Sequence, residues 1–91
     1  MIKSRARWGI SVKFYDFNGK KNICGERIHQ IRTTKRLSQS VLAAKMQLQG
    51  VIIEREAISK IETGLRLVTD YELAAFARVL QVSMQWLIEE E

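Results

Sequence analysis

The sequence has few of the residues on which several classes of protein depend. Among its 91 residues there is one cysteine, Cys24, one histidine, His29, and no proline. A single cysteine excludes an internal disulfide and cannot by itself build a cysteine-based zinc site. No apolar run approaches the ~20 residues of a membrane helix, and nothing resembles a secretory signal. We therefore expect a cytoplasmic protein with no membrane span, no metal and no other cofactor.

Length and composition fit one small globular domain. Hydrophobic residues make up 46% of the chain and charged residues 27%, which are ordinary values for such a domain. The sequence contains no nucleophile paired with a base, no metal-ligand spacing and no glycine loop that would cradle a phosphate. We therefore expect that the protein is not an enzyme.

The net charge of +5 is distributed unevenly along the chain. Residues 1–22 carry a net charge of +5, residues 23–66 carry +4 and residues 67–91 carry −4. A basic end and an acidic end suit a module that turns one face toward a polyanion. Charge alone does not distinguish DNA from RNA, from an anionic membrane or from a solvated surface without a partner.

The first 22 residues differ in pattern from the rest. Apolar and polar residues alternate over Ile10, Val12 and Phe14, and Asn18-Gly19 is a turn signal. The pattern favours a basic N-terminal arm, residues 1–22, with a short strand or half of a hairpin. Because a lone strand leaves its edge unpaired, the arm needs a partner or stays flexible.

From residue 23 onward the apolar residues take helical spacing, which predicts a compact all-α domain over residues 23–91. Five short helices are expected, at about residues 23–35, 39–46, 55–62 and 70–80, and then around Trp86 and Leu87. The expected N-caps are Asn22, Ser38, Thr69 and Ser83. The fourth helix is expected to bury Leu73, Phe76, Ala77 and Leu80. Trp86 has two interpretations, a core residue or part of an interface.

An ordered set of short motifs runs through this helical region: Leu37-Ser38-Gln39, Leu42-Ala43, Ile58-Ser59-Lys60-Ile61-Glu62-Thr63-Gly64 and Leu80-Gln81-Val82-Ser83. The set resembles the Cro- and phage-repressor-like (XRE-type) helix-turn-helix family over residues 23–88. The resemblance implies a five-helix, lambda-repressor-like DNA-binding fold. It also implies that the helix near residues 55–62 enters the major groove of double-stranded DNA.

Spacing within that helix agrees with the resemblance. Ile58 and Ile61 share one face, so the polar residues are turned the other way. The resemblance places base contacts at Arg55, Glu56, Ser59 and Lys60. It places a phosphate contact at Gln39 and contacts with the DNA backbone at Thr63 and Arg66. Arginine and lysine donate to guanine, and glutamate accepts from cytosine. The plainer interpretations are a surface Glu56–Lys60 pair, a polar first-turn Gln39 and a solvated Arg66.

Three further features come from the comparison with the family pattern. The resemblance implies a structural ion pair between Arg32 and Glu62 that links the first helix to the end of the reading helix. Two departures stand beside it. The turn at residues 47–52 is about five residues longer than is common in the family, and Arg36 stands where glycine is frequent. A left-handed backbone at Arg36 would be strained.

These patterns predict a sequence-specific transcriptional regulator, and more specifically a repressor. It would bind a double-stranded DNA operator as a homodimer. The alternative is the antitoxin of a toxin–antitoxin pair, which would bind a small protein partner and also its own operator. The strand-like leader and the acidic residues Glu89-Glu90-Glu91 motivate this alternative.

Overall fold

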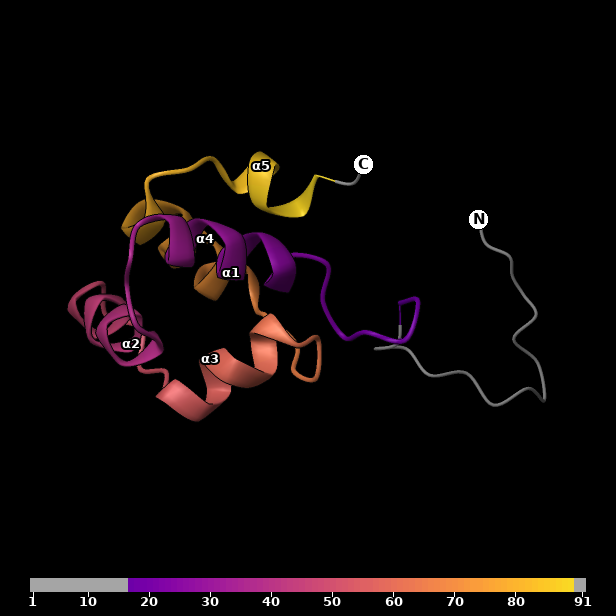
Figure 1. Cartoon of the computed structure of the whole chain (residues 1–91), viewed down its shortest axis with the longest axis horizontal. Helices are drawn as coiled ribbons and strands as arrows, with labels where there is room; N and C mark the ends of the chain where they lie inside the picture. Colours follow the sequence, from indigo (N-terminus) through magenta and orange to yellow (C-terminus); the bar gives the residue numbers. More distant parts are fainter. Residues whose placement is uncertain (1–16, 90–91) are drawn as a thin grey trace.

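The computed structural model describes residues 17–89, and this part of the chain folds into five helices (Figure 1). They are α1 (Gly25–Thr34), α2 (Gln39–Leu48), α3 (Arg55–Glu62), α4 (Asp70–Leu80) and α5 (Met84–Ile88). The predicted all-α architecture is confirmed. None of these helices is long and apolar enough to cross a membrane. The strand-like pattern over residues 10–14, most of the basic arm and the last two glutamates lie outside the described residues.

Three of the helices begin at the side-chain caps expected from the sequence. The Ser38 hydroxyl caps α2 and the Ser83 hydroxyl caps α5, each by accepting from a backbone N–H in the first turn. At α4, Thr69 accepts from the backbone of Glu72, whose carboxylate accepts from the backbone of Thr69. This reciprocal capping box satisfies two N–H groups that the helix itself leaves without a partner.

The start of α1 differs from the prediction. The helix begins at Gly25 with Cys24 as its N-cap, instead of at Ile23 with Asn22 as its N-cap. The Asn22 side chain still accepts from the Gly25 N–H through Oδ1, and its amide donates across to the backbone carbonyl of Ile61 at the end of α3. Asn22 therefore joins two helices.

The end of α2 also differs from the prediction, because the helix runs past Met46 to Leu48. Gly50, with a φ of 84°, supplies the left-handed residue that ends it, and the Val51 N–H then bonds back to the Met46 carbonyl. Part of the long turn is therefore an extra half-turn of helix. Val51 and Ile53 are buried on either side of the exposed Ile52, which anchors the rest of the turn in the core.

Every helix contributes at least one side chain without exposed surface to a single core. These are Ile28, Leu42, Met46, Ile58, Ile61, Phe76, Leu80 and Leu87. Each such burial is worth about 1.5–3 kcal/mol relative to exposure. Leu73 was expected among them but is only half-buried, because α4 turns the smaller Ala75 to the centre instead. Through this core α3 packs against α1 and α2, and so its orientation is fixed by both.

Candidate nucleic-acid interface

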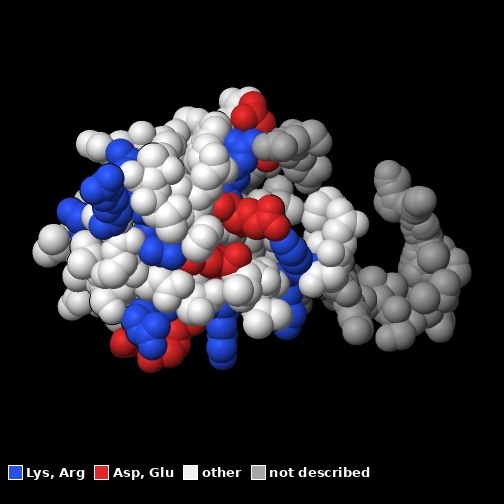
Figure 2. Space-filling model, viewed as in Figure 1, with Lys and Arg blue, Asp and Glu red and all other residues white. Residues whose placement is uncertain are grey.

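α3 has one apolar face and one polar face. Ile58 and Ile61 have no exposed surface, whereas Arg55, Glu56 and Lys60 are exposed and Ser59 is half-buried. Figure 2, in the same orientation as Figure 1, shows charged side chains of both signs projecting along the lower edge, where α3 lies. The helix therefore uses its apolar face for attachment and leaves its polar face open to a partner.

The charges on that polar face are held only loosely. Arg55 Nη2 lies 3.9 Å from Glu56 Oε2, and both side chains are more than half exposed. No ion pair joins Glu56 to Lys60 within the part of the chain that the structure describes, so the plainer interpretation of these two residues, a surface i, i+4 pair, is not observed. Exposed pairs of this kind contribute little free energy. Arg55 can therefore change its partner at small cost, and no side-chain ion pair of Lys60 has to be broken in the described part of the chain.

At its C-terminal end, α3 carries a buried carboxylate that gathers three other side chains. Arg32 donates to Glu62 through Nε at 2.6 Å and through Nη2 at 3.0 Å, which makes a bidentate ion pair. Gln39 Nε2 donates to Glu62 Oε1 at 3.0 Å, and His29 Nδ1 lies 3.0 Å from the same oxygen. Burial raises the pKa of Glu62, but the hydrogen bonds from Arg32, His29 and Gln39 lower it by more than burial raises it. The pKa of this carboxyl is therefore below its ordinary value.

This cluster fixes Gln39 relative to α3. Gln39 is the first residue of α2, and one of its two amide hydrogens is directed to Glu62. Arg32 also donates to the Leu37 carbonyl at 2.7 Å, which ties in the turn between α1 and α2. In that turn Arg36 has a φ of 59°, the left-handed conformation that glycine adopts more easily. Arg32 and Glu62 thus connect α1, α2 and α3 in one polar contact.

The loop after α3 holds the remaining two candidate residues in different ways. The Thr63 hydroxyl donates to the Ser59 carbonyl at 3.1 Å, within an exposed turn. Arg66 instead binds the carboxylate of Glu72 at 3.0 and 3.1 Å. Burial raises the pKa of Glu72, while the bonds from Arg66 and from the Thr69 backbone lower it more, so that its pKa is also below the ordinary value. The guanidinium of Arg66 is therefore turned toward the start of α4.

The structure thus brings together most of the residues singled out in the sequence, although from different positions. Gln39 is joined to the end of α3 through Glu62, whereas Arg66 points to α4. The remaining residues lie on α3 or directly after it: Arg55, Glu56, Ser59, Lys60 and Thr63. Sequence reasoning missed His29 and Glu72. The i, i+3 spacing of His29 and Arg32 on one helix is the signal that could have found the first.

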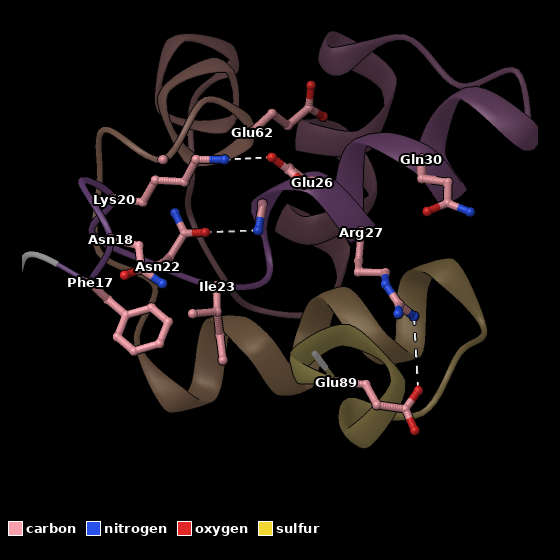
Figure 3. Close-up of a pocket in the computed structure, with 12 residues that line it drawn as sticks. Phe17, Asn18, Lys20, Asn22, Ile23, Glu26, Arg27, Gln30, Glu62 and Glu89 are labelled. Carbon is pink, nitrogen blue, oxygen red and sulfur yellow. Dashed lines mark hydrogen bonds and ion pairs between the residues drawn. The ribbon is translucent and has the colours of Figure 1, made fainter. Parts of the chain in front are cut away.

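Ahead of α1, a short hairpin lies against the end of α3. Phe17 and Lys20 pair across Asn18-Gly19, whose φ values of 54° and 82° are those of a type I′ turn, and this confirms the turn signal. A groove of about 500 Å³ separates the hairpin from the first turn of α1 and the end of α5 (Figure 3). At the wall of this groove, the Arg27 guanidinium lies 4.5 Å from the ring centre of the half-buried Trp86, which packs on the core.

Comparison with known proteins gives the same fold. The helix-turn-helix family model matches residues 28–87. The P22 c2 repressor protein, crystallised with synthetic operator 9T in the presence of Tl+, has 24% identity and a TM-score of 0.65, over 77% of this chain and 98% of that one. The restriction-modification controller protein C.AhdI from Aeromonas hydrophila has 28% identity and a TM-score of 0.62, over 70% of this chain and 86% of that one. No curated protein sequence matches the chain.

Proposed function

Because this chain belongs to the Cro- and phage-repressor-like (XRE-type) helix-turn-helix family, and is by that membership a DNA-binding transcriptional regulator, we propose that it is a sequence-specific repressor. In this proposal α3 lies in the major groove of double-stranded DNA. The observation that carries it is the division of α3, with Ile58 and Ile61 fully buried and the opposite face polar and open. An α-helix fits the major groove, where the side chains near its N-terminal end reach base edges.

Individual roles follow from the chemistry of the outward residues. Arg55 and Lys60 would donate to guanine O6 and N7, and Glu56 would accept from cytosine N4. Ser59 is only half-buried and has a small hydroxyl, which suits a contact with a base edge or a nearby phosphate. Because Arg55 and Glu56 are paired only at 3.9 Å, DNA would displace that contact at little cost.

Backbone contacts would set the position of α3 on the duplex. Gln39 lies at the N-terminal end of α2, where the free N–H groups of the helix favour an anion, and its second amide hydrogen would donate to a phosphate. Thr63 would exchange the exposed hydrogen bond from its hydroxyl to the Ser59 carbonyl for one to a phosphate. Arg66 uses three of its N–H groups on Glu72 and on the Leu67 carbonyl, so its phosphate contact would use the N–H groups that remain.

Selection of bound sequences from a pool of random duplexes tests this function. The wild type should enrich a defined site, and Lys60→Ala should lose preference at one base position while it keeps general affinity. Lys45→Ala is the matched control, because Lys45 is an exposed lysine in the last turn of α2. A uniform loss of affinity in Lys60→Ala would demote Lys60 to a phosphate contact. Failure of the wild type to enrich any sequence would reject the repressor proposal.

We also propose that two subunits bind together. Paired reading helices about one helical turn apart, ~34 Å, would match a near-palindromic operator. Analytical ultracentrifugation with and without the selected duplex tests this stoichiometry. Two chains on each palindromic duplex are expected, and one chain on each duplex at saturation would contradict the dimer.

A protein partner is the second candidate function, and one surface feature favours it. Among residues 17–89, Leu48 and Ile52 are the most exposed large apolar side chains, at 85% and 71%. A contiguous exposed apolar patch is typical of protein contacts, and these two side chains come from neighbouring positions of one turn, residues 47–52. In the antitoxin interpretation, a small protein encoded beside this one would co-purify with it, and Leu48→Glu would release that protein. A purified homodimer that retains no neighbour-encoded protein would contradict this second function.

A further inference from the structure

The segment Phe17–Asn22 lies ahead of the region matched by the family model, yet it is bonded to the end of the reading helix. The Lys21 backbone N–H donates to the Gly64 carbonyl at 2.8 Å. The Asn22 side-chain amide donates to the carbonyls of Ile61 at 3.0 Å and Arg66 at 2.8 Å. The segment therefore contacts the last turn of α3 and the loop that follows it.

The Asn22 side chain fixes this path completely. Besides its two donated hydrogen bonds, its Oδ1 accepts from the Gly25 N–H at 2.7 Å (Figure 3), so both amide hydrogens and the oxygen are engaged. The glycine at position 64 completes the fit. A Cβ there would lie 2.8 Å from Lys20 Cγ, and its φ of 81° is one that other residues rarely adopt. The hairpin is thus seated closely against the turn after α3.

The charges of the segment differ from one lysine to the next. The Lys20 ammonium is bound by Glu26 at the start of α1 (Figure 3), whereas Lys21 is exposed. The backbone of Lys21 is bonded to Gly64. Gly64 directly follows Thr63, and Thr63 is the residue for which we propose a contact with the DNA backbone. The amide of Asn22 also covers a carbonyl at the end of α3. Since a helix C-terminus carries partial negative charge, this cap reduces a repulsion that a nearby phosphate would meet.

We propose that Phe17–Asn22 is an additional DNA-backbone contact, in which Lys21 binds a phosphate and Asn22 positions it against the end of α3. The inference rests on the proposed function, because it uses the same orientation of α3 on the duplex. It extends the DNA-contacting surface N-terminal to the region that the family model matches, residues 28–87.

The salt dependence of DNA affinity tests the role of Lys21. Each phosphate contact makes the slope of log affinity against log salt more negative by about 0.9. When salt is raised from 50 to 200 mM, the factor by which affinity falls should therefore be about 3.5 times smaller for Lys21→Ala than for the wild type. Its base preference should not change. Lys35→Ala is the matched control, since Lys35 is also exposed and contacts Gln81; its slope should equal that of the wild type. Equal slopes for Lys21→Ala and the wild type would overturn the proposal.

The positioning role of Asn22 needs a measurement that stability alone would not move. Asn22→Ala should lower the salt slope as Lys21→Ala does, and the double variant should show no further fall in slope. Thermal unfolding, recorded in parallel, separates a loss of fold from a loss of contact. A less stable Asn22→Ala protein that keeps the wild-type slope would reject the positioning role. If Asn22→Ala does not fold, Lys21→Ala still decides the contact.

The same titrations on a random-sequence duplex separate this inference from the proposed function. A protein without sequence preference, but with a reduced slope in Lys21→Ala, would refute the repressor and support the backbone contact. A protein with sequence preference and an unchanged slope in Lys21→Ala would support the repressor and refute the contact.

Discussion

Replacing Gly25 by alanine should destabilise the protein, although the same change in most helices is favourable. Gly25 is the first residue of α1 and is buried against the end of α3. A Cβ at this position would lie 2.0 Å from the Ile61 carbonyl oxygen and 2.9 Å from Asn22 Oδ1. Carbonyl and Cβ do not approach closer than 3.0 Å, so α1 and α3 would have to separate by about 1 Å or more.

The expected magnitude follows from the balance of two effects. Alanine in place of glycine within a helix gains about 0.5–1 kcal/mol, whereas overpacking of a tight contact costs about 1–3 kcal/mol or more. The difference between the two effects makes the unfolding free energy of Gly25→Ala lower than that of the wild type by up to about 2.5 kcal/mol. For a domain of this size the largest loss corresponds to a fall of roughly 10–20 °C in Tm.

Thermal unfolding followed by circular dichroism measures this difference. Gly50→Ala is an instructive control, because a Cβ at Gly50 meets no atom within 4 Å but the residue has a φ of 84°. It should lose about 1–2 kcal/mol through backbone strain alone. A Gly25→Ala protein as stable as the wild type, or more stable, would refute the close approach of α1 and α3.

Three further predictions concern the buried charges and the thiol. Arg32→Ala should lower the unfolding free energy, measured with urea, by about 3–5 kcal/mol, because it leaves the Glu62 carboxylate buried without its main partner. The double variant Arg32→Met with Glu62→Leu should lose less, and a larger loss in the double variant would contradict this account. The pKa values of Glu62 and Glu72 are lowered in the folded state, so their stabilisation is complete above the unfolded pKa of about 4.3 and is lost as the pH falls through the folded values. Unfolding free energy should thus change little from pH 7 to 5 and then decrease, and a steep decrease above pH 5 would argue against these two groups as its source. Burial raises the pKa of Cys24 to about 11, so the native thiol should react with Ellman's reagent at pH 8 far more slowly than the thiol in urea, and equal rates would show that it is accessible.

Residue spacing predicted most of the fold because each helix carries its own local signals. Ser38, Thr69 and Ser83 are caps whose partners lie three residues away, and such short-range chemistry is legible in a sequence. The apolar face of α3 follows in the same way from Ile58 and Ile61. These signals act within one turn of helix, so they do not depend on how the chain folds back on itself.

What the sequence could not predict depends on contacts between distant segments. Asn22 has the composition of an N-cap, but its amide binds Ile61, 39 residues away. Arg66 is a loop cation in the sequence and the partner of a buried carboxylate in the structure. Asn22 makes this long-range bond in addition to its local bond with the Gly25 N–H, and Arg66 pairs with Glu72, whose buried carboxylate would be costly to leave without a partner.

The division of α3 into two faces has a consequence for how such a regulator diversifies. Ile58, Ile61 and Glu62 hold the helix in place, while Arg55, Glu56 and Lys60 take no part in the core. Mutations at these three outward positions therefore leave the folding of the domain almost untouched. If α3 reads DNA as proposed, duplicated genes can acquire new binding sites by changes at a few codons, without passing through an unstable intermediate.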